Sequence, residues 1–395
     1  MAKINKTLVF DPIPFKGGSK IATSDALTCS STQLHQFVVL SVTPDYWEST
    51  DFYAKHDVSV IRLFHSGWLI KHHNGPLYWL NQLTLLVQLF FVLCLQGKIT
   101  KIVGASGPGI DMPLYLAKRL FSFELIQMIH GNVGCSRSIG YCLTNADSVF
   151  YLPSARPSMK TALITYLSSL NNIADTEHIA ECYLKSANYQ SFVNGIPEHR
   201  WPTQSEQSLP IFFWSASLLK WKGLDLFIQA ARIASTFKPL AMNICFIRPK
   251  QTCLPISEAP INLNRHTQWY DDPSNLDEIR ANSNIFVSTS VNEPFGLSIL
   301  EALAAGMCVI LPQDGAFWDQ QLEHNVNCIK YQPNDPESLS NALLLAAHDP
   351  LLCQLCQTHA LDIAKQFKAE YRYMKFAQCL NGAGVTHLVS SLDHS

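Results

Sequence analysis

Charged side chains are scarce in this sequence, where they make up 15% of the 395 residues and leave a net charge of −2. A nucleic-acid-binding domain usually carries a strongly basic patch or stripe, so the composition argues against a nucleic-acid partner. Apolar residues account for 47% of the chain. That fraction indicates a folded protein with large cores and excludes a mainly disordered one.

The sequence also lacks the common motifs for phosphate and metal binding. It has no GxxxxGK[ST] loop and no D-x-D, and Gly104–Gly109 departs from the G-x-G-x-x-G pattern of dinucleotide sites. Asp271–Asp272 precedes Pro273, which is typical of a turn. Cys353 and Cys356 form a lone C-x-x-C without a suitably spaced histidine. We therefore expect no metal and no cofactor, and cysteines that are reduced core residues.

A secretion signal is also missing, because the first residues lead directly into a strand-like segment. The most apolar window, Leu77–Leu95, contains the amides Asn81, Gln82 and Gln88. Placing these amides in hydrocarbon would be costly, so a helix packed on a sheet is expected rather than a membrane span. These features together predict a cytoplasmic protein.

Short β-rich runs alternate with longer helical stretches, and the pattern restarts after a Pro-, Ser- and Gln-rich connection at 194–208. Such alternation predicts parallel βαβ units, and the length predicts two domains. We therefore expect an α/β fold of two Rossmann-like, doubly wound parallel-sheet domains that face each other across a cleft. The predicted domains are 1–198 and 199–367, with a C-terminal helix and tail, 368–395, that packs back towards the first domain.

The predicted strands are Thr7–Phe10, Phe37–Ser41, Val58–Phe64, Lys101–Val103, Leu125–Ile129, Ser148–Leu152, Leu209–Trp214, Met242–Ile247, Asn284–Ser288, Cys308–Leu311 and Cys328–Tyr331. The predicted helices are Met112–Phe121, Ser136–Asn145, Asp175–Ser186, Leu224–Ala234, Leu276–Ala281, Leu297–Ala305, Pro336–Ala347 and Leu351–Phe367.

The most informative segment is 292–306, which lies between two predicted strands of the second domain. Pro294 and Gly296 favour a turn there, and a helix is expected to begin near Leu297. A helix that follows a parallel strand begins at the carboxyl edge of the sheet, where ligands bind. The amides of Gly296, Leu297 and Ser298 are therefore candidates to bind a phosphate.

Two carboxylates accompany this predicted anion site. Glu293 lies in the loop, and Glu301 lies just over one turn inside the helix. Ionised carboxylates bind hydroxyl donors strongly, so one is expected to accept hydrogen bonds from a sugar and the other from a ribose.

The segment resembles the E-x7-E signature of retaining GT-B-fold glycosyltransferases of the family 4 type, which use nucleotide-sugar donors. The matching residues are Glu293, Pro294, Phe295, Gly296, Glu301, Ala302, Ala304 and Gly306. The resemblance implies that Glu293 is catalytic, and that Glu301, Phe295, Gly296, Leu297 and Ser298 bind the donor.

The segment 215–225 resembles the Lys-Gly loop of the same family, which neutralises the donor diphosphate. Lys222 and Gly223 match the Lys-Gly pair, and Ser217 stands where the family has an arginine. The resemblance therefore implies a catalytic role for Lys222. Lys220 is the candidate to replace the missing cation.

Three segments of the first domain also resemble the family. Gly17 and Gly18 follow the first strand, as in the family's glycine loop that faces donor and acceptor. His130 follows the strand 125–129 and resembles the family's histidine at the edge of the sugar site, so the resemblance implies that it is catalytic. The segments 146–149 and 192–196 match architectural motifs.

The resemblance implies transfer of a sugar, with retention and without a metal ion, from a nucleotide sugar to a saccharide or glycolipid acceptor. It further implies a role in polysaccharide or lipopolysaccharide assembly at the inner face of the plasma membrane, with possible peripheral contact with that surface. Two alternatives stay open. One is a nucleotide-sugar 2-epimerase, and the other, suggested by Ser217, is an inactive protein that binds nucleotide sugars.

Overall fold

The computed structural model describes residues 5–31, 35–72, 74–170, 175–249, 252 and 254–382. It divides into two compact units, one of Met1–Gly195 with Ala369–Ser395 and one of Ile196–Lys368. The chain crosses into the second unit at 195/196, three residues before the predicted boundary. The predicted cleft between the two domains stays a prediction.

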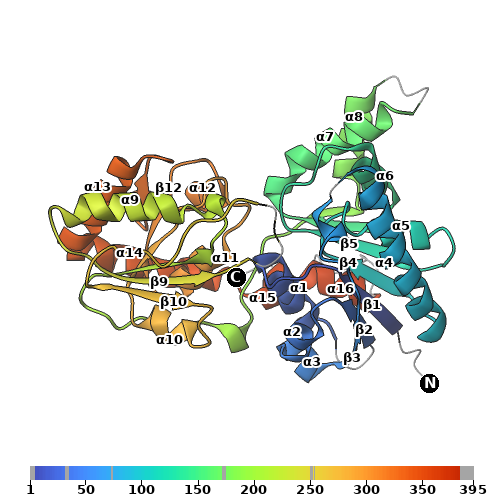
Figure 1. Cartoon of the computed structure of the whole chain (residues 1–395), viewed down its shortest axis with the longest axis horizontal. Coiled ribbons are helices and arrows are strands. Elements are labelled where there is room, and N and C mark those ends of the chain that lie inside the picture. The colour runs from blue at the N-terminus through green and yellow to red at the C-terminus, as the bar shows by residue number, and fades with distance from the viewer. Residues whose placement is uncertain are drawn as a thin grey trace, which may run out of the picture. The chain divides into compact units, whose positions relative to one another are not determined.

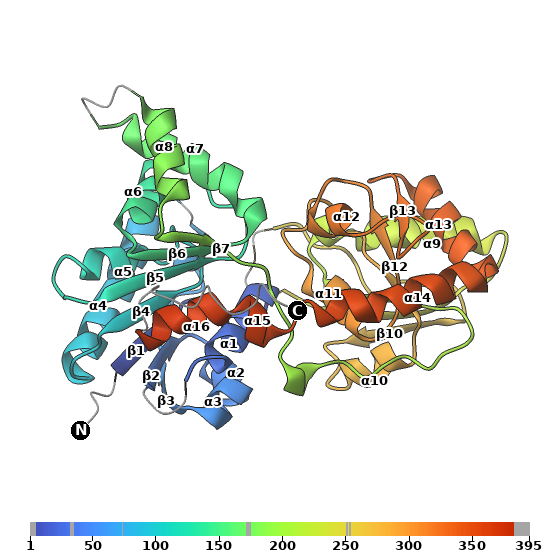
Figure 2. The same ribbon diagram turned by 180° about the vertical axis from the view of Figure 1, so that it is seen from behind.

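The first unit is built on seven parallel strands in the order β3-β2-β1-β4-β5-β6-β7 (Figures 1 and 2). Most of these segments are short runs rich in Val, Ile, Leu and Phe that are buried, as expected for a sheet covered on both faces. The strands are β1 Asn5–Asp11, β2 His35–Ser41, β3 Asp57–Arg62, β4 Lys101–Gly104, β5 Glu124–Ile129, β6 Ser148–Tyr151 and β7 Tyr189–Ser191.

Ten α-helices are described in the first unit, and the last two come from the C-terminal part of the chain (Figures 1 and 2). They are α1 Gly18–Thr28, α2 Pro44–Glu48, α3 Asp51–Lys55, α4 Gly75–Leu95, α5 Met112–Ala117, α6 Arg137–Asn145, α7 Arg156–Leu167, α8 Thr176–Lys185, α15 Ala369–Arg372 and α16 Met374–Asn381. The helix α4 packs Leu85 and Leu89 into the core beneath it, so the expected helix on a sheet is confirmed.

The C-terminal helices, red in Figure 2, pack against the first sheet through polar as well as apolar contacts. The Tyr373 hydroxyl contacts Asn194 Oδ1 at 3.2 Å. Lys101 at the start of β4 binds Glu124 at 2.8 Å and donates to the carbonyl of Cys379 in α16. Residues 369–382 therefore belong to the first unit although they follow the second in sequence.

The second unit contains six parallel strands in the order β10-β9-β8-β11-β12-β13. The strands are β8 Ile211–Ser217, β9 Ala241–Ile247, β10 Thr267–Asp271, β11 Ile285–Val287, β12 Cys308–Pro312 and β13 Ile329–Tyr331. The helices are α9 Leu224–Ser235, α10 Leu276–Ala281, α11 Leu297–Ala304, α12 Phe317–Gln321, α13 Pro336–His348 and α14 Pro350–Lys365. The prediction of two doubly wound parallel sheets is confirmed.

Both strands that sequence reasoning missed, β7 and β10, lie at sheet edges. β7 has three residues, and β10 reads Thr-Gln-Trp-Tyr-Asp with none of them buried. Edge strands lack the continuous apolar run that marks a central strand, so hydrophobicity alone does not reveal them. The predicted set also omitted α7 and the five-residue helices α2, α3 and α12, which are too short to show a helical repeat.

Strand order reverses between β1 and β4 in the first sheet and between β8 and β11 in the second. In doubly wound sheets, ligands bind at the carboxyl ends of the strands where the order reverses. The loops after these four strands are therefore the places to look for a site.

Candidate functional site

Lys222 and Glu293 meet at the strand-order reversal of the second unit. Lys222 follows β8, Glu293 follows β11, and Lys222 Nζ lies 2.5 Å from Glu293 Oε2. The Lys222 ammonium also lies 4.0 Å from the centroid of the Trp221 ring. Both side chains keep part of their surface exposed, 19% for Lys222 and 16% for Glu293. The structure thus joins two residues that the sequence indicated separately.

The loop that carries Lys222 is fastened to the end of β11 by Thr289. Thr289 Oγ1 donates to the Lys222 carbonyl at 2.8 Å and accepts the Trp214 indole N–H at 2.9 Å. The next residue, Gly223, has φ 75° and begins α9 as its N-cap. A Cβ on Gly223 would lie 2.3 Å from the Thr289 carbonyl oxygen. The glycine after Lys222 is therefore required by the fold, because only glycine lets the backbone at 223 lie this close to the Thr289 carbonyl.

The helix α11 begins where the sequence placed it, immediately after Gly296. Gly296 has φ 83° and accepts the amides of Ile299 and Leu300 at 3.1 and 3.2 Å. Leu297 and Ser298 lie in the first turn, where amide groups have no acceptor within the helix. Both residues are partly exposed. Their amides can therefore donate to an anion at the positive end of the helix dipole.

The Phe295 side chain anchors this loop in an aromatic cluster. It is 2% exposed and packs with Phe317, Trp318 and Phe367, with ring centroids 5.0, 5.4 and 6.2 Å away. The Trp318 indole N–H donates to the Gly296 carbonyl at 3.2 Å. Phe295 was expected to bind the nucleotide-sugar donor. Because its side chain is buried, only its backbone can make that contact.

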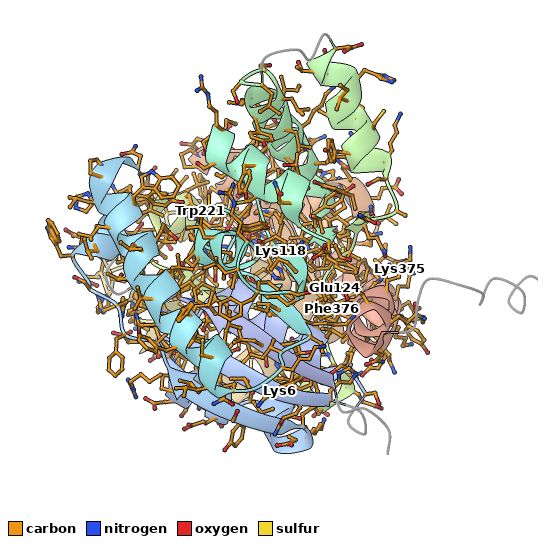
Figure 3. All side chains as sticks on the ribbon, turned by 90° about the vertical axis from the view of Figure 1, so that its right-hand side faces the viewer. Lys6, Lys118, Glu124, Trp221, Lys375 and Phe376 are labelled. Atoms are coloured by element: carbon orange, nitrogen blue, oxygen red, sulfur yellow. The ribbon has the colours of Figure 1, made fainter. Side chains whose placement is uncertain are left out.

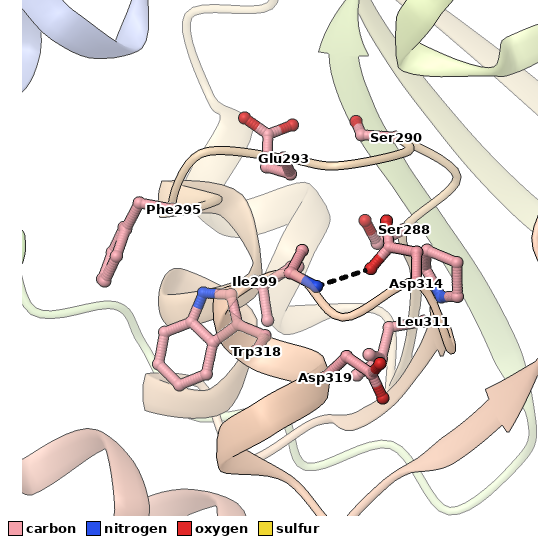
Figure 4. A pocket seen from close by; sticks show the side chains of 11 residues that line it. Ser288, Ser290, Glu293, Phe295, Ile299, Leu311, Asp314, Trp318 and Asp319 are labelled. Carbon is pink, nitrogen blue, oxygen red and sulfur yellow. Dashed lines mark hydrogen bonds between the residues drawn. The ribbon is translucent and has the colours of Figure 1, made fainter. Parts of the chain in front are cut away.

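A hollow of about 10 Å³ opens beside these residues, and Figure 4 shows Glu293, Phe295 and Trp318 around it. It is about the size of one water molecule, far too small for a nucleotide sugar. The polar groups around the hollow, rather than the hollow itself, therefore mark the candidate site.

Glu301 lies on α11 between two arginines that sequence reasoning missed. Its Oε1 lies 3.2 Å from Arg200 Nη2, and its Oε2 lies 2.8 Å from Arg280 Nη2. Arg280 is buried and also binds Asp277 at 2.9 Å. Glu301 thus has a structural task in addition to any ligand contact. Neither arginine belongs to a motif, so the sequence offered no signal for this cluster.

Lys220, the expected substitute for the missing arginine, belongs to the 3-10 turn Lys220–Lys222. Its Nζ lies 3.8 Å from Asp225 Oδ2 at the start of α9, and its side chain is 57% exposed. Ser217, at the arginine position, is the last residue of β8 and is partly exposed. Lys222 is therefore the cation that contacts Glu293, whereas Lys220 contacts Asp225.

In the first unit, the glycine loop and His130 lie at the carboxyl edge of the sheet. Gly17 is the N-cap of α1, and Gly18 is the first residue of that helix. Gly17 has φ −134°, so its value as glycine lies in the absence of a side chain rather than in a left-handed backbone. His130 directly follows β5 and reaches α1 through Thr23, at 3.0 Å from Nε2 to Oγ1.

The contacts of Thr23 assign the tautomer of His130. The Thr23 hydroxyl has one proton, which it donates to the Ser19 carbonyl at 2.8 Å. In this arrangement Nε2 of His130 carries the ring proton and donates it to Thr23 Oγ1, which leaves Nδ1 as the acceptor. His130 is partly exposed as a residue, but Nδ1 is buried and has no partner in the described part of the chain. Burial lowers the pKa of His130 to about 4, so the ring is neutral at physiological pH.

A buried carboxyl group lies beside the loop after β4. Asp111 Oδ2 accepts the Ser106 amide at 3.0 Å and the Gln127 side-chain amide at 2.8 Å. Burial raises the pKa of Asp111 to about 7, although these hydrogen bonds oppose the rise. The group therefore holds its proton in the folded chain at pH values where it would ionise in the unfolded chain.

We expect Asp111→Asn to change how stability depends on pH. Between pH 3.8 and about 7 the folded wild type binds more protons at this site than the unfolded chain. Its free energy of unfolding therefore falls across this window, by an amount on the order of a few kcal/mol. Asparagine cannot ionise, so the free energy of unfolding of the variant should increase relative to that of wild type as pH rises.

The measurement is chemical unfolding of both proteins at pH 4.5 and pH 8. Wild type must be compared with Asp111→Asn, because a second group also makes stability depend on pH. Burial of His130 makes the free energy of unfolding rise between about pH 4 and pH 6.5, opposite to the effect of Asp111. An unchanged difference between the two proteins at both pH values would show that Asp111 is ionised in the folded chain.

No group of three or more His, Cys, Asp or Glu side chains suited to a metal ion occurs in the described ranges. The C-x-x-C residues Cys353 and Cys356 are buried with Cys308 in the core of the second unit. All three are free thiols in the core, as expected, whereas Cys94, Cys135 and Cys182 are exposed, so the expectation of core cysteines is wrong for those three.

The sequence of this chain is similar to those of known glycosyltransferases. Residues 195–361 match the family model described as glycosyl transferases group 1. Sucrose-phosphate synthase 1 of Arabidopsis thaliana is 30% identical over 105 residues, which are 26% of this chain and 10% of that protein. The chain thus spans only a small part of the length of this curated relative.

Solved structures resemble nearly the whole chain. HepE from Anabaena, in complex with UDP and glucose, has a TM-score of 0.68 at 16% identity and covers 96% of this chain and 100% of its own. Sucrose-phosphate synthase from Thermosynechococcus elongatus has a TM-score of 0.69 at 14% identity, covering 96% and 99%. The lipopolysaccharide outer core galactosyltransferase WaaB has a TM-score of 0.61 at 11% identity, covering 96% and 99%. The chain therefore has the GT-B fold, and residues 195–361 resemble the glycosyl transferases of group 1.

Proposed function

We propose that this protein transfers a sugar from a nucleotide-sugar donor to a saccharide or lipid-linked acceptor, with retention of the anomeric configuration. The observation that carries the proposal is the Lys222–Glu293 pair beside the open N-terminus of α11, at the strand-order reversal of a unit that resembles the glycosyl transferases of group 1. A uridine nucleotide is the first donor to test, because HepE has been solved with UDP-glucose.

In this mechanism the leaving group is a nucleoside diphosphate, whose negative charge grows as the glycosidic bond breaks. An ammonium group has three N–H donors, so Lys222 can bind a phosphate oxygen as well as Glu293. The Leu297 and Ser298 amides add donors that need no reorganisation. We assign Glu293 to the hydroxyls of the donor sugar, and the departing phosphate to removal of the acceptor proton.

His130 is assigned a hydrogen-bonding task in the same reaction. A ring with its pKa lowered to about 4 does not supply a proton at neutral pH. We infer that its unprotonated Nδ1, which is buried and has no partner in the described part of the chain, accepts a hydrogen bond from a hydroxyl of the sugar or of the acceptor when the ligand binds. Gly17 and Gly18 would let that ligand approach the start of α1.

We place the reaction in polysaccharide or lipopolysaccharide assembly at the cytoplasmic face of the plasma membrane, with peripheral contact to that membrane. WaaB, which acts on the lipopolysaccharide outer core, supports this placement through its shared fold.

The experiment is a screen of nucleotide sugars for release of nucleoside diphosphate, with and without oligosaccharide or glycolipid acceptors. A transferase releases the diphosphate faster when an acceptor is present, and NMR of the product gives the anomeric configuration. Conversion of a donor without any acceptor would instead indicate a 2-epimerase. Binding without turnover would indicate an inactive nucleotide-sugar-binding protein.

Transfer is expected to survive chelation. In the proposed site, Lys222 and the α11 amides neutralise the diphosphate, so no step depends on a divalent ion. Activity in EDTA should therefore equal activity in the untreated enzyme. Loss of activity in EDTA that Mg²⁺ or Mn²⁺ restores would show that the site works in a different way.

Glu301→Ala is expected to weaken binding of the nucleotide by about 1.5–3 kcal/mol through loss of ribose contacts. The variant also leaves the buried Arg280 without one of its carboxylates, so its thermal midpoint should fall. Glu301→Gln is the matched control, because it keeps an acceptor oxygen and the side-chain shape. Titration of UDP, GDP and ADP separates the two effects. A lower midpoint with unchanged nucleotide affinity would restrict Glu301 to holding the arginines.

A further inference from the structure

The helix α4 presents an apolar face to solvent. It spans 21 residues without a single charged side chain, and by length and composition it could cross a membrane. Only 33% of its most apolar window is buried, however, and the buried part packs on the first sheet. A helix that is apolar all round is usually enclosed on every side. Here one side is covered by protein and the other is left open.

The polarity of α4 is inverted relative to an ordinary surface helix. Its amides Asn81 and Gln82 are only 6% and 3% exposed, whereas Leu83, Phe91 and Leu95 are 54%, 58% and 80% exposed. We name the exposed stripe the α4 outer face, which consists of Trp79, Leu80, Leu83, Val87, Phe90, Phe91 and Leu95. Contiguous apolar surface of this kind indicates a binding surface.

Neighbouring segments extend the α4 outer face. The helix α4 itself, light blue, runs along the side of the first unit that faces the viewer in Figure 3. Leu120, 72% exposed, and Phe121 close an apolar hollow of about 250 Å³ against α4. Phe64, 71% exposed, is held beside α4 because the Gln88 side chain pairs with its backbone N–H and C=O, both at 2.8 Å. Trp68 adds a second exposed tryptophan.

Cations border this surface, although Arg62, Lys101 and Lys118 are paired with Asp45, Glu124 and Asp147. Residues 58–123 contain six Lys and Arg and a single acidic residue, Asp111, which is fully buried. Lys71 before α4 and Lys98 after it are both exposed, as is Arg119 next to Leu120. Cations near an anionic bilayer contribute about 1 kcal/mol each, and tryptophan favours the bilayer interface.

These features together identify one occupant. A second copy of this chain would bring the exposed cations Lys71, Lys98 and Arg119 towards the same cations of its partner. An anionic lipid surface instead matches both the apolar face and its cationic border. We propose that the α4 outer face docks on a membrane rich in anionic lipids while α4 stays folded on its sheet.

This proposal specifies the membrane contact named in the proposed function, but it does not depend on catalysis. Flotation with vesicles measures it without donor or acceptor, so failure of binding would leave the transferase proposal intact, and the reverse also holds. Wild type should float with vesicles of phosphatidylcholine containing phosphatidylglycerol and should stay behind with phosphatidylcholine alone.

The double variant L83E/F91E should lose roughly tenfold or more in vesicle binding, because two exposed apolar side chains that would enter the bilayer become charged. Phe237→Glu is the matched control, since Phe237 is 76% exposed on the second unit, and it should bind like wild type. Lys98→Glu should weaken binding to anionic vesicles less than the double variant. Circular dichroism and thermal unfolding confirm that each variant is folded.

Three results would overturn the proposal. One is wild type that does not bind anionic vesicles, and another is folded L83E/F91E that binds as wild type does. The third is a dimer, detected by light scattering, that L83E/F91E abolishes while vesicle binding stays absent. That result would make the α4 outer face an interface between copies.

Discussion

Replacing Lys222 with alanine should lower kcat/KM for sugar transfer by a factor on the order of 10²–10³. The ammonium lies 2.5 Å from Glu293, whose side chain lies beside Gly296, the N-cap of α11. It is therefore placed to stabilise charge that appears on the diphosphate only as the bond to the sugar breaks. An interaction made mainly in the transition state lowers kcat when it is lost. Steady-state kinetics with the donor found by the screen measures the effect.

Lys220→Ala is the matched control, because Lys220 lies in the same 3-10 turn but contacts Asp225. We expect Lys220→Ala to cost far less than Lys222→Ala. Ser217→Arg, which restores the family residue, should leave activity intact or raise it. Near-normal turnover in Lys222→Ala together with an inactive Ser217→Arg would show that this loop is not a phosphate site.

Gly223→Ala should destabilise the fold more than Lys222→Ala, Lys220→Ala or Ser217→Arg does. We expect its free energy of unfolding to fall by at least about 3 kcal/mol. Two costs add at this position. A φ of 75° is unfavourable for any residue with a Cβ, and that Cβ would lie 2.3 Å from the backbone oxygen of Thr289. A backbone atom cannot move away as a flexible side chain could, so β11 or the start of α9 must shift.

Gly315→Ala separates the two costs. Gly315 has φ 77°, but a Cβ built there meets nothing within 4 Å. This variant should therefore lose only the conformational part, about 1–2 kcal/mol. Chemical unfolding of both variants gives the comparison. Equal losses would mean that the Thr289 contact relaxes without cost, and the close approach would then not explain the glycine.

The central strands and the site loops of the second unit could be predicted because their signals are local. A buried run such as Cys308–Leu311 marks a strand by itself, and Pro294 with Gly296 marks the turn before α11. Parallel strands then bring the loops after β8 and β11 to one edge, so Lys222 and Glu293 could be expected near each other.

The pairing of Glu301 could not be predicted, because it depends on contacts distant in sequence. Arg200 lies 101 residues before Glu301 and Arg280 lies 21 residues before it. Their side chains meet only through the packing of α10 and α11 with the segment that enters the second unit. The outward face of α4 was equally hidden, since its apolar composition suits a core helix as well as an exposed one.

The most direct test of the account is a crystal structure of the protein with a bound nucleoside diphosphate, beginning with UDP. The account predicts diphosphate oxygens within hydrogen-bonding distance of Lys222 Nζ and of the Leu297 and Ser298 amides. A diphosphate bound away from the start of α11, with Lys222 still contacting Glu293 alone, would contradict it.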